Sequence, residues 1–182
     1  MLTSKRHMLK NVILIGFMGT GKSTIGRLLS KSLGYPLIDT DHHIEAQEGR
    51  PITEIFANEG EDHFRDIETQ LLRDLQSQQA HKHIVSTGGG IILREENRQL
   101  LQELGFVVWL VATPENILER TARNRDRPLL HTEDPAETIR KLIEYRKPFY
   151  AESAHLTLET TGLTFSEITT GIIESARYHY GH

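Results

Sequence analysis

The sequence has no cysteine among its 182 residues, a single tryptophan, and no apolar run of membrane-spanning length. The lack of cysteine excludes disulfide bonds, cysteine-ligated zinc or iron–sulfur sites, and thiol catalysis. A transmembrane helix needs about 20 consecutive apolar residues, and the basic start of the chain is not followed by the apolar segment of a secretory signal. We therefore expect a soluble, cytoplasmic protein with no membrane partner.

The charge balance narrows the choice of partners, because the formal net charge is −4 and the isoelectric point is near 6.2. A general polyanion binder needs an excess of basic residues, so we expect no nucleic-acid partner. The length suits one α/β domain with a substantial core. We expect residues 1–9 to form a flexible N-terminal extension and residues 10–182 to form a single domain that acts as a monomer.

Residues 12–29 contain the most specific motif, an apolar strand that runs through G-x-x-x-x-G-K-S into an amphipathic helix. Glycines let the main chain curl so that its N–H groups converge on a polyphosphate. Lys22 adds a positive charge, the helix that begins there adds its positive dipole end, and the Ser23 hydroxyl is placed to ligate the Mg²⁺ that accompanies ATP. The motif predicts a phosphate-binding loop (P-loop) with contacts from Gly19, Thr20, Gly21, Lys22, Ser23 and Thr24.

Apolar runs alternate with helical patterns along the chain, which predicts parallel βαβ units. The expected strands cover residues 12–15, 36–39, 83–86, 106–111 and 155–158, and the expected helices cover 22–33, 42–48, 53–58, 61–77, 95–104, 114–122, 135–146 and 166–177. Residues from about 121 to 135 are expected to form a mobile flap. Ligands of such folds bind at the carboxyl ends of the strands, where the loops that begin at Gly16, Asp39, Thr87 and Ala112 should gather.

Two carboxylates follow the second expected strand, in Asp39-Thr40-Asp41. Alternation along a strand would point both toward the bound phosphates. Asp39 is placed to hold the metal through its water shell, and Asp41 to orient an acceptor hydroxyl and assist its deprotonation. The alternative is that Asp41 only caps the following helix.

Two weaker signals lie in the middle of the chain. Arg65 could reach the cleft as a fork for a carboxylate, although a solvated arginine that pairs with Asp62 or Glu68 is the default for such a helix. The three glycines Gly88, Gly89 and Gly90 weaken a strand, so they indicate either close approach of a ligand to the backbone or a turn with positive φ. Arg120, Arg123, Arg125, Arg127 and Arg146 bring positive charge to the flap and to the helix after it.

The segments GFMGTGKST, LIDTD, FRDIE, STGGG, RPLL and YRKPFY, in this order and spacing, make the chain resemble shikimate kinases from Lys10 to Arg177. The resemblance implies a three-layer P-loop kinase fold with a five-stranded parallel sheet flanked by helices and a mobile flap, related to nucleoside monophosphate kinases. It also implies that ATP phosphorylates the 3-hydroxyl of shikimate in aromatic amino-acid biosynthesis, with Mg²⁺ as cofactor.

The resemblance also implies residue roles. The shikimate-binding residues of the family correspond to Asp41, Arg65, Gly88, Gly89, Gly90 and Arg146, so that the two arginines clamp the carboxylate and Asp41 accepts hydrogen bonds from hydroxyls. Arg127 corresponds to a flap arginine that contacts ATP and stabilises the transferred phosphoryl group, and Arg120 to a residue that packs on adenine. The expected catalytic residues are Lys22, Asp41 and Arg127, and Ser23 and Asp39 are the expected Mg²⁺ ligands.

Two other functions compete with this interpretation. A kinase of another small hydroxy acid such as gluconate would share the P-loop and the fold, but the paired arginines and the triple glycine favour shikimate. A nucleotide-dependent switch without turnover would have no need for the acceptor residues, all of which are present.

Overall fold

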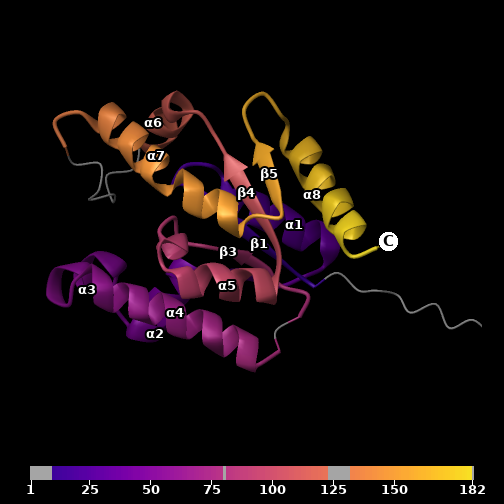
Figure 1. Cartoon of the computed structure of the whole chain (residues 1–182), viewed down its shortest axis with the longest axis horizontal. Helices are drawn as coiled ribbons and strands as arrows, with labels where there is room; N and C mark the ends of the chain where they lie inside the picture. Colours follow the sequence, from indigo (N-terminus) through magenta and orange to yellow (C-terminus); the bar gives the residue numbers. More distant parts are fainter. Residues whose placement is uncertain (1–9, 80, 123–131, 182) are drawn as a thin grey trace, which may run out of the picture.

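Figure 1 shows a computed structural model of the chain, which describes residues 10–79, 81–122 and 132–181. The predicted N-terminal extension, most of the predicted flap and Arg127 lie outside these ranges. In the described ranges, no helix is both long and apolar enough to cross a membrane.

Five parallel strands form one sheet in the order β2-β3-β1-β4-β5. Their bounds are β1 (Asn11–Ile15), β2 (Leu37–Asp39), β3 (Ile84–Ser86), β4 (Gly105–Val111) and β5 (Leu156–Glu159). The central strand β1 aligns Ile13 with Val85 of β3 on one side and with Val107 of β4 on the other. Every residue of β1 is buried, as parallel strands covered on both faces require.

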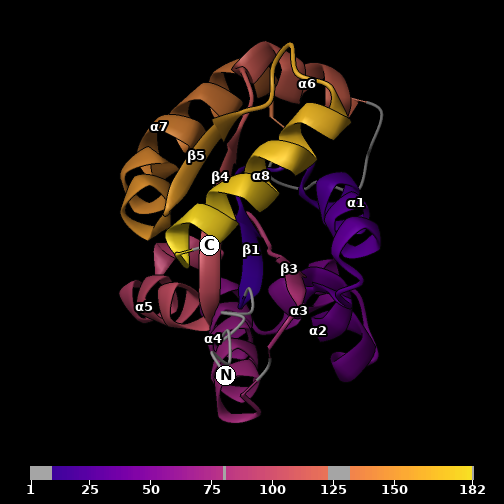
Figure 2. The same cartoon turned by 90° about the vertical axis from the view of Figure 1, so that its right-hand side faces the viewer.

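Helices cover both faces of this sheet (Figure 2). They are α1 (Lys22–Leu33), α2 (Thr40–Glu48), α3 (Ile52–Asn58), α4 (Glu61–Ser77), α5 (Glu95–Leu104), α6 (Pro114–Ala122), α7 (Pro135–Ser153) and α8 (Phe165–His179), together with a short 3-10 helix η1 (Ile91–Leu93). α1 and α8 pack on the face formed by Val12 and Leu14, while α4, α5 and α7 pack on the face of Ile13 and Ile15. The three-layer α/β fold with five parallel strands is therefore confirmed.

Alternation along β1 explains the two cores. Ile13 points into the core beneath α4 and α5, whereas its neighbour Leu14 points into the core beneath α1 and α8. Gly34 ends α1 in the left-handed conformation that glycine adopts without steric cost, with φ of 67°.

Some element boundaries differ from the predictions. The helix expected over 135–146 continues to Ser153, with Pro148 inside it. A proline in a helix costs about 3 kcal/mol, but the last turns of α7 place Tyr150 in the core and Phe149 against it, and this packing outweighs the cost. The 3-10 helix at 91–93 was not predicted, and α2 begins at Thr40 rather than at residue 42.

Candidate active site

The P-loop curls between β1 and α1, as the motif predicts. Gly19 and Gly21 have φ of 77° and 95°, and Gly21 is the residue immediately before α1. The Lys22 ammonium donates to the carbonyl oxygens of Gly16 and Phe17 at 2.8 and 2.9 Å. The Lys22 side chain is therefore folded back over the start of the loop.

A cavity of about 260 Å³ opens beside this loop. It is lined by residues of the P-loop, of the β2–α2 junction and of the segment after β3: Met18, Gly19, Gly21, Lys22, Ser23, Thr24, Asp39, Asp41, Thr87 and Gly89. The structure thus brings five of the six predicted P-loop residues and both carboxylates to one place at the carboxyl ends of the strands, as the fold requires. The sixth, Thr20, is buried and its hydroxyl donates to the Phe17 carbonyl oxygen at 2.8 Å.

The two carboxylates line this cavity, but the elements that place them there differ from those that the sequence analysis predicted. Asp39 is the last residue of β2 and accepts a hydrogen bond from the N–H of His42, so Asp39 caps α2. Asp41 lies in the first turn of α2, where the positive end of the helix dipole stabilises a negative charge. The argument from strand alternation was therefore wrong, and so was the alternative that Asp41 is the cap; the first helical turn carries Asp41 back over the strand end.

Asp39 also accepts a hydrogen bond from the Ser23 hydroxyl at 3.1 Å. This pair offers a carboxylate and a hydroxyl oxygen at the edge of the phosphate site, which are the hard oxygen ligands that Mg²⁺ prefers. The two predicted metal ligands are thus close enough to serve one ion.

Arg65 is buried, contrary to the default expectation of a solvated arginine. Only 8% of the residue is exposed, and its guanidinium donates to Glu68 at 2.6 Å and to Glu61 at 2.8 Å. The ring of Phe64 lies 5.3 Å from the guanidinium carbon. Because a desolvated guanidinium needs anionic partners, this position suits a carboxylate-binding group better than a surface charge.

Glu68 is a buried carboxylate beside Arg65 that the sequence analysis did not include among the site residues. It was considered only as a surface partner of Arg65, yet it is completely buried. Burial raises the pKa of Glu68 to about 7, and the Arg65 guanidinium opposes this shift. One carboxylate oxygen, Oε2, is held by Arg65, so Glu68 fixes the orientation of the guanidinium.

The three glycines after β3 give space to these side chains. None has a φ in the left-handed region, so the alternative of a turn that requires positive φ is wrong. A Cβ atom on Gly88 would lie 2.5 Å from Oδ1 of Asp41, and one on Gly90 would lie 2.6 Å from Cζ of Arg65. The side chains that approach the bare backbone at Gly88 and Gly90 are therefore two of the predicted acceptor-binding residues.

Arg146 approaches the same turn from α7. It is 5% exposed, lies over the ring of Phe17 at 5.5 Å, and its Nη1 is 3.4 Å from the Gly89 carbonyl oxygen. Arg120, in the last turn of α6, donates to the carbonyl oxygen of Gly19 in the P-loop at 3.0 Å. Arg146 thus lies at the glycine turn and Arg120 beside the P-loop, while Arg127 is outside the described residues.

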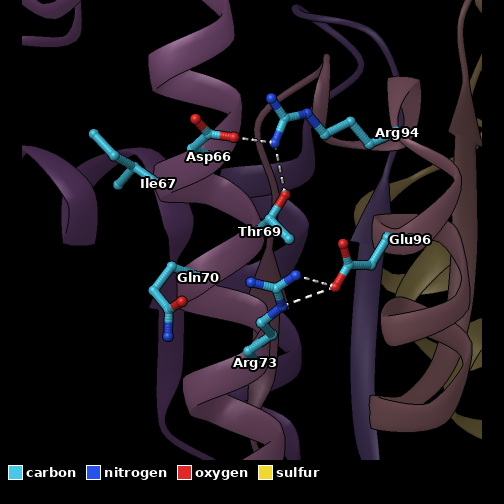
Figure 3. Close-up of a pocket in the computed structure, with 7 residues that line it drawn as sticks. All are labelled: Asp66, Ile67, Thr69, Gln70, Arg73, Arg94 and Glu96. Carbon is cyan, nitrogen blue, oxygen red and sulfur yellow. Dashed lines mark hydrogen bonds and ion pairs between the residues drawn. The ribbon is translucent and has the colours of Figure 1, made fainter.

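A second cavity, of about 460 Å³, lies between α4 and the start of α5 (Figure 3). It contains none of the predicted site residues. Its two arginines are already paired, Arg94 with Asp66 at 2.6 Å and Arg73 with Glu96 at 2.5 Å. These ion pairs join the two helices, and we assign no ligand to this cavity.

Comparison with known proteins agrees with this geometry. The family model described as "Shikimate kinase" matches residues 18–177. A curated shikimate kinase of Burkholderia thailandensis is 47% identical over 150 residues, which cover 82% of this chain and 80% of the relative. A solved structure of the Acinetobacter baumannii shikimate kinase in complex with shikimate superposes with a TM-score of 0.89 at 39% identity and 97% coverage of both chains. A gluconokinase from Sinorhizobium meliloti, at 16% identity, a TM-score of 0.52, and 94% and 97% coverage, shares the fold alone.

Proposed function

The chain belongs to the shikimate kinase family, and on that premise we propose how its residues share the work of the reaction. The enzyme transfers the terminal phosphoryl group of ATP to the 3-hydroxyl of shikimate, giving shikimate 3-phosphate and ADP. One observation carries the assignment of residues: Asp41, Arg65 and Arg146 come from three helices and meet at one glycine turn. That turn lies beside the P-loop, so acceptor and nucleotide sites adjoin.

Arg65 and Arg146 bind the carboxylate of shikimate in this proposal. Both guanidinium groups are largely buried and lie against consecutive glycines, Gly90 and Gly89. A guanidinium fork binds a carboxylate through two parallel hydrogen bonds, and its gain is greatest where water is excluded. Glu68 keeps the Arg65 fork in place.

Asp41 accepts a hydrogen bond from the 3-hydroxyl and aims its oxygen at the terminal phosphorus atom. Transfer is then direct and in line, with no covalent intermediate on the enzyme. Lys22 stabilises the charge that develops on the phosphate oxygens, and the resemblance assigns the same task to Arg127 from the flap. Arg120 packs on the adenine ring, a task that its position beside Gly19 supports.

Ser23 and Asp39 would hold Mg²⁺. When bound, the ion neutralises charge on the phosphate oxygens of ATP and helps to orient them. The 3.1 Å separation of the two oxygen atoms supports this assignment.

We also propose that the enzyme works as a monomer in the cytoplasm, without a nucleic-acid or membrane partner. The support is that one chain supplies every residue that this mechanism uses, so no second copy is needed to complete the site. The use of ATP as co-substrate supports the cytoplasmic location.

Gluconate as the acceptor is not favoured, because the gluconokinase shares only the fold. A switch without turnover would not need the buried pair of arginines. The test is ADP release by the purified protein with Mg²⁺–ATP and either shikimate, gluconate or no acceptor. We expect release only with shikimate; ATP binding without shikimate-dependent release would overturn the proposal.

A further inference from the structure

Tyr150 is a buried polar residue to which the mechanism above gives no role. It lies on α7, one turn after Arg146, and is only 2% exposed. Its hydroxyl donates to the carbonyl oxygen of Gly89 at 2.6 Å. Its ring stacks on Trp109 of β4, with the ring centroids 5.5 Å apart and the planes 17° from parallel.

The acceptor of this hydrogen bond lies in the centre of the glycine turn. Glycine has a much wider choice of backbone angles than other residues, so three glycines in succession do not determine how their peptide groups face. The carbonyl oxygens of Gly88 and Gly90 accept from the N–H groups of Ile91 and Leu93 in η1, so the Gly89 carbonyl is the one of the three that depends on partners from outside the turn. The Gly88 N–H donates to the Thr40 hydroxyl at 3.0 Å on one side, and the Gly89 carbonyl accepts from Tyr150 on the other.

This turn is the surface on which the acceptor-binding side chains rest. Arg65 lies against Gly90, Asp41 against Gly88, and Nη1 of Arg146 is 3.4 Å from the same Gly89 carbonyl that Tyr150 holds. The Gly89 backbone also approaches the P-loop, because a Cβ there would lie 3.5 Å from the carbonyl oxygen of Gly16. A rotation of the Gly89 peptide would therefore move the supports of all three side chains.

We propose that Tyr150 is a positioning residue for the acceptor site: its hydroxyl fixes the Gly89 peptide and thereby the arrangement of Asp41, Arg65 and Arg146. It touches neither substrate. Burial raises the pKa of Tyr150 to about 12, so the hydroxyl stays a donor at every pH at which the enzyme would be assayed. The inference rests on the proposed function, since it concerns the site for shikimate.

The test compares Tyr150→Phe with the wild type. Phenylalanine keeps the ring that stacks on Trp109 and removes only the hydroxyl. Loss of one buried hydrogen bond should raise the KM for shikimate about tenfold and also lower kcat, because Asp41 shifts together with the two arginines, while the KM for ATP changes by less than about twofold. The fluorescence of Trp109, the single tryptophan of the chain, should stay unchanged without shikimate, which would show that the stacking persists.

Tyr145→Phe is the matched control. It removes a hydroxyl from the same helix, but the Tyr145 residue is 62% exposed, so both KM values should equal those of the wild type. Thr40→Val removes the opposite tether of the turn and should also raise the KM for shikimate selectively.

An unchanged KM for shikimate in Tyr150→Phe would overturn the inference. So would equal increases in both KM values together with a lower melting temperature, because this pattern indicates a general packing role. Calorimetric titration of the wild type with shikimate separates the two proposals. A wild type that binds no shikimate would overturn both. If the wild type turns over shikimate and Tyr150→Phe has the same KM for shikimate, this inference alone is overturned.

Discussion

The close contact between Gly90 and Arg65 gives a sharp test of the acceptor site. Gly90 has φ of −101° and ψ of −1°, which alanine adopts without difficulty, so Gly90→Ala adds only a methyl group. The added Cβ would lie 2.6 Å from Cζ and 2.7 Å from Nη1 of Arg65. Carbon atoms in contact are about 3.5 to 4 Å apart, so one group must move. The guanidinium will move, because it is at the end of a long side chain.

The size of the effect follows from what Arg65 does. A hydrogen bond to a charged group contributes about 1.5 to 3 kcal/mol, so displacement of the fork should raise the KM for shikimate roughly 10- to 150-fold. Displacement also weakens the contact of 2.6 Å to the buried Glu68, and the free energy of unfolding should fall by about 1 to 3 kcal/mol. The KM for ATP should remain unchanged, because Arg65 lines no part of the P-loop cavity.

The assay is steady-state ADP release with shikimate varied at saturating ATP, and then with ATP varied. Gly171→Ala on α8 is the control, because a Cβ there would meet no atom within 4 Å and glycine-to-alanine exchange in a helix is stabilising. Equal KM values for shikimate in the two variants would refute the reasoning. They would mean that the position of Arg65 against Gly90 is not the one used to bind the acceptor.

Three further predictions concern single groups. Asp41→Asn should lower kcat by at least about 100-fold with a small change in the KM for shikimate, as single-turnover rates would show; near-wild-type turnover would exclude the proposed role. The raised pKa of Glu68 means that the folded protein holds this proton up to about pH 7, whereas the unfolded chain releases it near its usual value of 4.5. The free energy of unfolding of the wild type should therefore fall as pH rises through this window, by roughly 3 kcal/mol relative to that of Glu68→Gln. Urea unfolding of both proteins at pH 5 and pH 8 measures this change, and the same difference between the two proteins at both pH values would contradict burial as the cause. Burial lowers the pKa of His155, whose Nδ1 accepts a hydrogen bond from the Val107 N–H, so the folded protein favours the neutral ring. The free energy of unfolding should therefore fall as pH drops below 6.5 in the wild type, and fall less in His155→Gln.

Much of the fold follows from local patterns that the structure keeps. The P-loop lies between β1 and α1 because the glycine-rich segment cannot continue either element, and α1 covers residues 22–33, as predicted. The order of strands and helices predicted the parallel sheet. The prediction ended α7 at residue 146, whereas the helix continues through Pro148 to Ser153, where Tyr150 gains core contacts that local patterns do not reveal.

The sequence analysis failed where a polar residue is buried, since it assumed that charged residues on a helix face water. On α4 the residues Arg65, Glu68, Leu72 and Leu75 are separated by three, four and three positions and are all buried, so they form one stripe. The charged pair thus occupies positions that the apolar period assigns to the core. Burial of a charge is unfavourable unless it is paired, and Arg65 and Glu68 pair with each other at 2.6 Å. Two opposite charges three residues apart on an otherwise apolar stripe are therefore a signal that could have identified Glu68, and with it the burial of Arg65, before the structure was known.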